Sequence, residues 1–500
     1  MNTDAPDQQL PLPRPSFAFA RRHGVIVNAW IDGRVQLCVR EGASIDAVQE
    51  TRRFVGQPIK LKPVAAPEFD ALLQKTYEGQ TAASAALIDG MDDAEDLDAL
   101  AHALQDNQDL LESSDDAPVI KFINGLLVEA IKENASDIHI ESFETRLQIR
   151  FRVDGVLREV MAPPRALGPR LVSRIKVMAK LDIAEKRLPQ DGRISRAFGG
   201  RKIDVRVSTI PTGANSERVV MRILDQQAER LDIEQLGMMP EQAALLTRLI
   251  ERPYGILLVT GPTGSGKTTT LYSALSALND RSRNIMTVED PIEYNIDGIG
   301  QTQVNSKVSM TFARGLRAIL RQDPDVVMIG EIRDLETAEI AVQASQTGHL
   351  VLSTLHTNTA VGAITRLRDM GVEPYQLSAS LIGLMAQRLV RTLCPACKTP
   401  YEASMIEKEQ LAVDPTLPLT LYKPEGCGQC RHTGFSGRSG IHELIGLDRH
   451  LETLIHDQAS EQQMETYART RHPGILDSGR AKVIAGKTTL KEVLRVTIEA

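Results

Sequence analysis

Aromatic residues and long apolar runs are scarce in this sequence. Phe, Tyr and Trp make up 4% of its 500 residues, with a single tryptophan, Trp30. Because proteins often bind single-stranded nucleic acid by stacking bases on aromatic side chains, this scarcity disfavours that class. No apolar stretch approaches the roughly 18 residues of a membrane-spanning helix, and the polar residues 1–10 lack a signal pattern. We therefore expect a cytoplasmic protein that reaches a membrane only peripherally, through a partner or a surface.

One segment of the chain has no positive charge. Residues 76–120 contain no Lys or Arg but hold twelve Asp and Glu residues. Because the formal net charge of the whole chain is −7, the remaining residues are mildly basic. The overall acidic balance still disfavours a general DNA-binding protein. We interpret residues 91–117 as an acidic linker, in which residues 97–104 carry apolar side chains at the spacing of a short helix.

The length and the changes of pattern along the chain predict several domains of ordinary globular composition. Apolar spacing indicates helices at 45–55, 68–77 and 119–134, and alternation indicates strands at 137–141, 147–153 and 203–210. The expected divisions are an N-terminal module at 1–90, the linker at 91–117, an α+β domain at 118–228, an α/β core at 229–390, a tetracysteine subdomain at 391–440 and a helical region at 441–500.

A phosphate-binding loop is the strongest motif. The apolar run 256–260 reads as a strand, the segment 261–268 matches G-x-x-x-x-G-K-[ST], and residues 269–278 suit a helix. The glycines allow backbone N–H groups to surround phosphate oxygens, and Lys267 supplies a positive charge for the β- and γ-phosphates. Thr268 offers a hydroxyl to Mg²⁺. The predicted ATP-binding residues are Gly261, Pro262, Thr263, Gly264, Ser265, Gly266, Lys267, Thr268 and Thr269.

Acidic residues follow two further predicted strands. The apolar run 326–329 precedes Gly330 and Glu331, so the usual strand-end Asp is missing and Glu331 becomes the candidate to orient or deprotonate an attacking water. The turn at 288–293 holds three carboxylates, including Glu289 and Glu293. Such a like-charge cluster is costly unless a cation lies beside it, and Mg²⁺ bound with ATP would be that cation.

Histidines flank another apolar run, at 350–353. His349 precedes this predicted strand, and His356 follows it within the sequence His-Thr-Asn. A polar side chain at the end of such a strand can sense a γ-phosphate, so we include His356 among the catalytic candidates with Lys267, Glu289, Glu293 and Glu331.

Two Cys-x-x-Cys pairs indicate a structural zinc site. Cys394 and Cys397 are separated by 29 residues from Cys427 and Cys430. Four thiolates suit tetrahedral Zn²⁺ and leave no open position for catalysis. The long spacer predicts an inserted loop between the pairs. The remaining cysteine, Cys38, is expected to be a small buried residue.

The order of these motifs resembles that of the secretion and pilus motor ATPases. The resemblance rests on the phosphate-binding loop, Glu-Asp-Pro-Ile-Glu at 289–293, Gly-Glu-Ile-Arg-Asp at 330–334, and the segments 347–358, 135–141, 188–193 and 434–443. It extends from about residue 117 to the C-terminus. Within this group, Leu-Pro-Arg-Pro-Ser-Phe-Ala at 12–18 and Arg-Arg-His-Gly at 21–24 resemble the general secretion pathway protein E family of type II secretion.

The resemblance implies a fold and an assembly. It implies a RecA-like ATPase domain preceded by a PAS-like α+β domain and a small N-terminal module, with a zinc subdomain near the C-terminus. Six such subunits would form a ring. Arg193 and Arg206 match the positions of the family's inter-lobe arginines, which would complete a nucleotide site and make hydrolysis depend on conformation.

The resemblance also implies a function and partners. The chain would be an ATP hydrolase that drives assembly of a pseudopilus and export of folded proteins without touching the cargo. Residues 1–90 would bind the cytoplasmic domain of platform protein L of the inner membrane, and platform protein F would be a second partner.

Three alternatives remain open. A type IV pilus assembly motor would share the core but not the N-terminal module. A nucleic-acid translocase would show salt-dependent DNA affinity, although the charge and aromatic content speak against it. A nucleotide-gated scaffold would support secretion without turnover.

Overall fold

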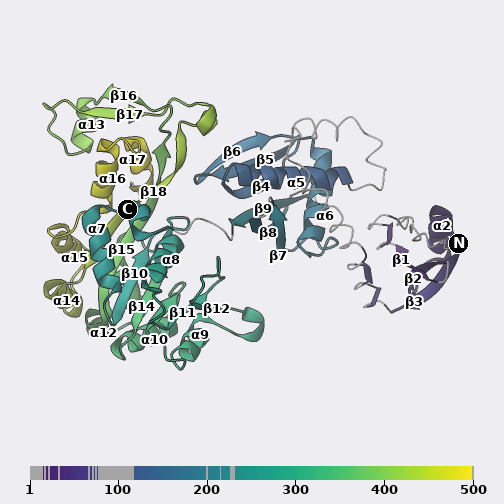
Figure 1. Ribbon diagram of the computed structural model, residues 1–500, viewed down its shortest axis with the longest axis horizontal. Helices are drawn as coiled ribbons and strands as arrows, with labels where there is room; N and C mark the ends of the chain where they lie inside the picture. Colours follow the sequence, from purple (N-terminus) through teal and green to yellow (C-terminus); the bar gives the residue numbers. More distant parts are fainter. Residues whose placement is uncertain are drawn as a thin grey trace, which may run out of the picture. The chain divides into compact units, whose positions relative to one another are not determined.

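The computed structural model describes residues 15, 19–20, 23–31, 34–65, 68–69, 72–73, 76, 117–198, 201–213, 216–225 and 231–497. These residues belong to two compact units, 1–225 and 226–500, which are described separately (Figure 1). Residues 91–116 of the acidic linker, with the helix expected at 97–104, lie outside the described residues. So do residues 1–14 and half of the residues of the helix expected at 68–77. None of the helices within the described ranges is long and apolar enough to cross a membrane.

A three-stranded sheet forms near the N-terminus. Strand β1 (Val25–Ile31) pairs antiparallel with β2 (Arg34–Arg40), and β2 pairs parallel with β3 (Ile59–Val64) through the crossover helix α2 (Ile45–Val55). Helix α2 was predicted at these bounds. Ser44 caps its first turn by accepting the Ala47 N–H, and Gly56, with φ of 63°, ends it. Cys38 on β2 is fully buried, as predicted.

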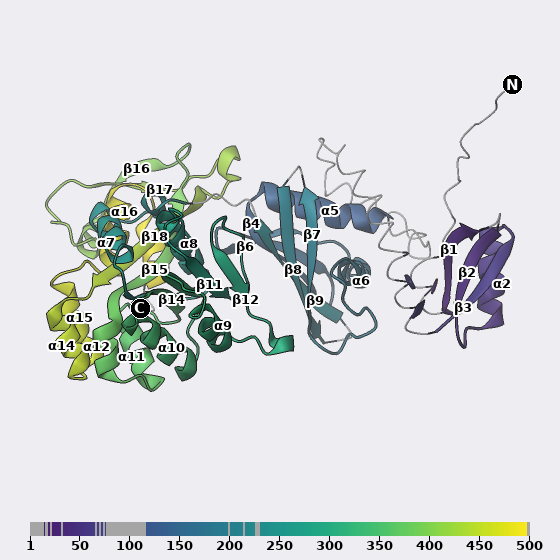
Figure 2. The same cartoon turned by 60° about the horizontal axis from the view of Figure 1, so that its bottom comes forward.

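An antiparallel six-stranded sheet follows, in the order β6-β5-β4-β9-β8-β7. Helices α5 (Ala117–Lys132) and α6 (Gly168–Met178) pack on one face of it (Figures 1 and 2). Because side chains alternate along each strand, apolar residues such as Ile138 and Val205 enter this core, whereas charged residues such as Arg150 and Arg222 lie on the opposite face. The strands are β4 (Ala135–Ser142), β5 (Leu147–Val153), β6 (Val156–Met161), β7 (Gln190–Phe198), β8 (Arg201–Thr212) and β9 (Ser216–Asp225).

The C-terminal unit is built on a seven-stranded sheet in the order β12-β11-β13-β14-β10-β15-β18. All neighbouring strands pair in parallel except β15 and β18. Parallel pairing follows from the alternation of strands and helices in sequence. The strands are β10 (Gly255–Thr260), β11 (Ile285–Glu289), β12 (Gly300–Gln303), β13 (Val326–Ile329), β14 (Leu350–Leu355), β15 (Leu381–Leu393) and β18 (Phe435–Gly446).

Helices cover both faces of this sheet. On β10, Ile256 and Leu258 enter one core, and Leu257 and Val259 enter the other. Helices α7 (Pro240–Ile250) and α8 (Lys267–Leu278) close the second core. The helices that close the first core are α9 (Phe312–Ile319), α10 (Leu335–Gln346), α11 (Gly362–Asp369), α12 (Pro374–Ser380), α14 (Arg449–His456) and α15 (Glu461–Arg469).

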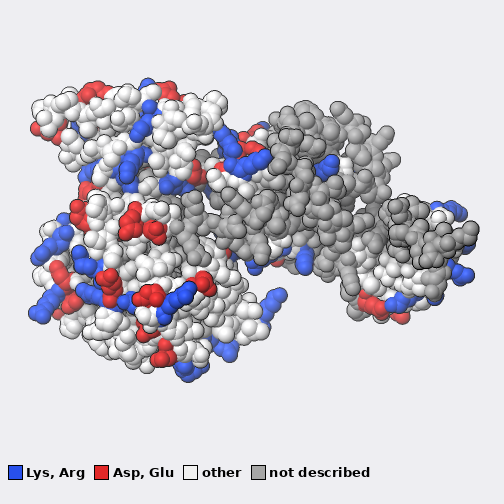
Figure 3. Space-filling model, viewed as in Figure 1, with Lys and Arg blue, Asp and Glu red and all other residues white. Residues whose placement is uncertain are grey.

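A small subdomain is inserted between β15 and β18. It contains β16 (Thr399–Glu402), α13 (Met405–Gln410) and β17 (Thr420–Lys423). This is the insertion that the spacing of the cysteine pairs predicted. The chain ends with α16 (Ile475–Ile484) and α17 (Leu490–Thr497), in the region predicted to be helical. On the visible face of the C-terminal unit, acidic and basic side chains are interspersed (Figure 3).

Candidate nucleotide-binding and metal sites

The phosphate-binding loop connects β10 to α8 and approaches β15 very closely. A Cβ atom at Gly261 would lie 2.5 Å from the carbonyl oxygen of Gln387, and one at Gly266 would lie 2.7 Å from Gln387 Nε2. Both positions also have positive φ, 144° and 91°. Only glycine therefore fits. The Ser265 hydroxyl is buried and has no hydrogen-bond partner among the described residues. A buried hydroxyl without a partner, close to the N-terminus of a helix, fits a loop that binds phosphate.

Lys267, the first residue of α8, folds back over this loop. Its Nζ donates to the carbonyl oxygens of Gly261 (2.6 Å) and Pro262 (3.2 Å). Burial lowers the pKa of Lys267 to about 8, and the Arg388 charge acts in the same direction, whereas Glu331 opposes both. A phosphate placed here would supply the negative charge that favours the ammonium form.

Glu331 lies directly beyond the carboxyl end of β13, and its carboxylate has two nitrogen-bearing side chains beside it. His356 Nε2 lies 3.3 Å from its carboxylate, and Arg333 donates a short hydrogen bond to it. Burial alone would raise the pKa of Glu331, but the hydrogen bonds and charges of Arg333 and His356 lower it below its ordinary value. Glu331 is therefore an ionised carboxylate, as a water-orienting base must be.

The topology explains why these residues meet. Lys267 follows β10, Glu331 follows β13 and His356 follows β14, and these three strands are neighbours in the parallel sheet. The carboxyl ends of parallel strands lie at one edge, where α/β proteins form their ligand sites. The structure thus brings together these three of the predicted catalytic residues.

Hydrogen bonds from several elements surround the acidic turn after β11. Glu289 is 3% exposed and accepts hydrogen bonds from Tyr272, from Thr287 Oγ1 (2.5 Å) and from Gln301 Nε2 (3.1 Å). These protein donors stabilise the buried carboxylate, and the expected cation beside the turn stays a prediction. The Tyr272 hydroxyl also accepts the backbone N–H of Glu293 (3.3 Å).

The other charges of this turn also have protein partners. The peptide bond before Pro291 is cis, and Asp290 lies 3.6 Å from Arg333. No local sequence pattern indicates the roles of Tyr272 and Gln301, because their contacts with the turn come from a helix and a neighbouring strand.

Arg193 and Arg206 lie on adjacent strands of the N-terminal unit. They face each other in the register of β7 and β8, on the charged side of the six-stranded sheet. Arg193 forms an ion pair with the buried carboxylate of Asp204. Because each unit is described separately, their part in a nucleotide site stays a prediction.

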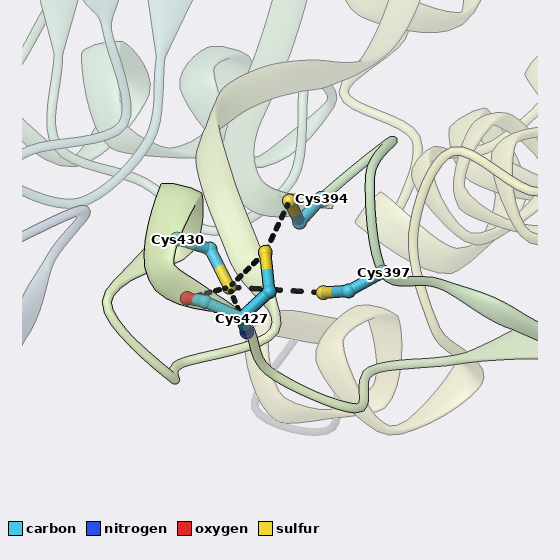
Figure 4. A group of neighbouring side chains, drawn as sticks. All are labelled: Cys394, Cys397, Cys427 and Cys430. Carbon is cyan, nitrogen blue, oxygen red and sulfur yellow. Dashed lines mark hydrogen bonds between the residues drawn. The ribbon is translucent and has the colours of Figure 1, made fainter.

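The four cysteines of the two pairs converge at the ends of β15 and β18 (Figure 4). Their sulfur atoms all lie within 4.8 Å of one another, with Cys397 Sγ 3.7 Å from Cys430 Sγ and Cys394 Sγ 4.0 Å from Cys427 Sγ. None of the four forms a disulfide. Tetrahedral zinc with Zn–S bonds of about 2.3 Å requires sulfur separations near these values.

Backbone donors surround the sulfur atoms of this cluster. Burial would raise the pKa of Cys430, but the N–H groups of Cys427 and Gly434 and the neighbouring thiols lower it below its ordinary value. Backbone N–H groups favour the thiolate form that binds zinc. The four sulfur atoms therefore fit a structural zinc ion, and His432 is not a member of this cluster.

Two family models match the sequence. The model described as "Type II/IV secretion system protein" matches residues 112–495, and a model for an N-terminal domain of "GSPII protein E" matches residues 14–77.

Curated relatives match nearly the whole chain. Type II secretion system protein E of Pseudomonas aeruginosa is 58% identical over 495 residues, which cover 99% of this chain and 97% of that protein. Type II secretion system ATPase E of Vibrio cholerae is 57% identical over 499 residues, which cover 99% of each.

Solved structures share the fold. The pilus retraction motor PilT with bound ADP has a TM-score of 0.51 and 28% identity, covering 74% of this chain and 95% of that chain. The Legionella pneumophila ATPase DotB has a TM-score of 0.58 and 21% identity, covering 76% of this chain and 96% of that chain. These structures confirm the α/β fold of a P-loop ATPase that the sequence predicted.

Proposed function

Since the chain belongs to the type II secretion system protein E family and is an ATP-hydrolysing secretion ATPase, we propose that it acts as a cytoplasmic hexameric motor. In this proposal, hydrolysis drives assembly of a pseudopilus and thereby the export of folded proteins. The observation that carries the proposal is the meeting of Lys267, Glu331 and His356 at one edge of the parallel sheet. The type IV pilus assembly motor is not favoured, because the curated relatives are type II secretion proteins.

The chain's own residues would divide the reaction between them. The N–H groups of residues 261–269 and the Lys267 ammonium would bind the phosphates of ATP. The ionised Glu331 carboxylate would orient the attacking water and accept its proton, and His356 would hold that carboxylate in place. Mg²⁺, which an ATPase of this family implies, would be held by Thr268 and would neutralise charge on the phosphate oxygens. Glu289 and Glu293 would shape the acidic turn that borders this site.

Arg193 and Arg206 would complete the site in the assembled ring. Two observations support this role. Both residues match the positions of the family's inter-lobe arginines, and they lie opposite each other where β7 pairs with β8. If the domain at 118–228 delivers these positive charges when the ring closes, hydrolysis depends on conformation, which a motor requires. An isolated subunit would then hydrolyse ATP slowly.

The zinc subdomain would stabilise the C-terminal part of the ATPase unit. A zinc ion held by the four cysteines would tie the end of β15 to the start of β18, the antiparallel pair at the edge of the sheet. This role is structural, because all four coordination positions are filled by protein.

The partners proposed are other components of the secretion system. Residues 1–90 would bind the cytoplasmic domain of platform protein L and so attach the motor peripherally to the inner membrane, with platform protein F as a second partner. The motor would contact neither cargo nor nucleic acid. Interspersed charges on the visible face of the C-terminal unit agree with the latter expectation (Figure 3).

A complementation experiment tests this proposal. In a strain deleted for this gene, exported enzyme activity and pilus-dependent surface motility are measured after complementation with wild type or Lys267→Ala. Loss of export with intact motility, restored by wild type but not by Lys267→Ala, supports type II secretion. Loss of motility with intact export would assign the chain to the pilus system instead.

A further inference from the structure

Arg388 lies behind the phosphate-binding loop and belongs to none of the recognised motifs. It is on β15, which pairs in parallel with β10, the strand that leads into the loop. The residue is 5% exposed. Burial lowers the pKa of Arg388, and the charge of Glu443 on β18 acts in the opposite direction. Because burying a cation is costly, the hydrogen bonds of this guanidinium call for an explanation.

The hydrogen bonds of Arg388 join two parts of the site. Nη1 donates to the carbonyl oxygen of Gln387 (3.0 Å), and Nη2 donates to both the carbonyl oxygen (3.0 Å) and the side-chain Oδ1 (3.2 Å) of Asn358. A Cβ atom at Gly261 would lie 3.2 Å from Nη1, so the guanidinium touches the first glycine of the phosphate-binding loop. Asn358 lies two residues after His356 in the loop that follows β14.

This loop, residues 356–359, is held at two further points. Thr260, at the end of β10, accepts the N–H of Thr357 at its Oγ1 (2.8 Å). Thr359 Oγ1 donates to Glu461 on α15 (3.0 Å). Because the His356 side chain is 52% exposed, side-chain packing constrains it weakly, and the loop backbone determines whether it reaches Glu331.

We propose that Arg388 is a positioning residue for ATP hydrolysis, which fixes loop 356–359 through Asn358 so that His356 meets Glu331. The proposal rests on the roles proposed above for Glu331 and His356. The rigid fork of a guanidinium can bind the Gln387 carbonyl and both oxygens of Asn358 at once, whereas an ammonium group on a flexible stem cannot hold the same geometry. Arg388 thus packs beside Gly261 of the phosphate-binding loop while it holds the loop that carries His356.

The test uses steady-state kinetics of the full-length protein. The variants are Arg388→Lys, Asn358→Ala, His356→Gln and Arg388→Lys combined with His356→Gln, with kcat and KM measured for MgATP. We expect Arg388→Lys and Asn358→Ala each to lower kcat by about 10- to 100-fold while KM changes by less than about threefold, because misplacing a reacting group affects the chemical step. In the His356→Gln background, Arg388→Lys should lower kcat by less than about a further threefold. Both changes disrupt the same contact, the one between His356 and Glu331.

Arg391→Lys is the matched control. It makes the same substitution on the same strand, but Arg391 pairs with Glu492 on α17. Its kcat should remain within about twofold of wild type, and its thermal midpoint measures what an Arg→Lys change on β15 does to folding. If Arg388→Lys does not fold, Asn358→Ala carries the test, because Asn358 lies on an exposed loop.

Three results would overturn the proposal: an unchanged kcat in Arg388→Lys, a loss confined to KM, or losses that multiply fully in the double variant. Glu331→Gln is assayed in parallel. It shows whether a negative result concerns only the role of Arg388 or also the proposed role of Glu331. If Glu331→Gln is inactive while Arg388→Lys is fully active, only the role of Arg388 is wrong. If Glu331→Gln keeps wild-type kcat, the proposed role of Glu331 is wrong, and the role of Arg388 fails with it.

Discussion

Glu331 and His356 face each other at the ends of two neighbouring parallel strands, with His356 Nε2 3.3 Å from the Glu331 carboxylate. Arg333, two residues after Glu331, donates a hydrogen bond to the same carboxylate. Burial of Glu331 would favour its protonated form, but these two partners outweigh burial and keep its pKa below the ordinary value. The pair therefore combines an ionised base with a residue that can hold its orientation.

Replacing the histidine should change the pH dependence of hydrolysis. In His356→Gln, Glu331 loses a neighbouring charge that favours its ionised form, so its pKa should rise and the acid limb of kcat should move to higher pH. We expect kcat at pH 7.5 to fall by about tenfold. A pH–rate profile from about pH 3.5 to 8 checks this, because the pKa of Glu331 lies below the ordinary carboxylate value, with exposed His456→Gln as the control. An unshifted acid limb in His356→Gln would show that the two residues do not act together.

ATP binding should weaken at alkaline pH. Because burial lowers the pKa of Lys267 to about 8 in the nucleotide-free protein, its ammonium form is lost as pH rises above that value. The affinity for a non-hydrolysable ATP analogue should then fall by up to about tenfold for each further pH unit. Titrations between pH 7 and 10 measure this fall. Lys267→Ala should bind weakly at every pH; a wild-type affinity that stays constant up to pH 10 contradicts the prediction.

Tyr272→Phe should destabilise the ATPase unit. The substitution removes a hydroxyl that is hydrogen-bonded to the buried Glu289 and leaves that carboxylate with one donor fewer. The expected loss in the free energy of unfolding is about 1–3 kcal/mol. Denaturant unfolding measures it, and Tyr254→Phe, at a 57% exposed tyrosine, should change stability by less than about 0.5 kcal/mol. Equal stability of both variants would mean that Glu289 does not depend on Tyr272.

The cysteine cluster should bind one zinc ion per chain. Metal analysis of purified protein should give one equivalent for wild type and for Cys38→Ala, which changes the cysteine outside the cluster. Cys397→Ser should lose the metal, and a strong chelator should lower the thermal midpoint of wild type but not that of the variant. Zinc-free wild-type protein with an unchanged thermal midpoint would exclude a structural role.

Local patterns predicted much of this structure. The apolar run 326–329 is β13, the helix at 45–55 is α2, and the phosphate-binding loop lies between the predicted strand and helix. Such features depend on residues close together in sequence, so spacing alone reveals them. The spacing of the cysteine pairs likewise predicted both the cluster and the insertion between them.

Long-range contacts were not predictable in this way. Gln387 and Arg388 reach the phosphate-binding loop only because β15 pairs beside β10, and nothing in the run 381–393 indicates that neighbour. Likewise, no local pattern indicates that Tyr272 and Gln301 donate hydrogen bonds to Glu289 in the acidic turn, because these donors come from other elements.

The most direct test of a motor driven by hydrolysis is Glu331→Gln, assayed for ATP hydrolysis by purified protein and for export in the deletion strain. We predict that kcat falls by at least about 100-fold, that the ATP analogue still binds, and that export is not restored. Restored export by a variant without turnover would contradict this prediction, because the chain would then act as a nucleotide-gated scaffold rather than a motor.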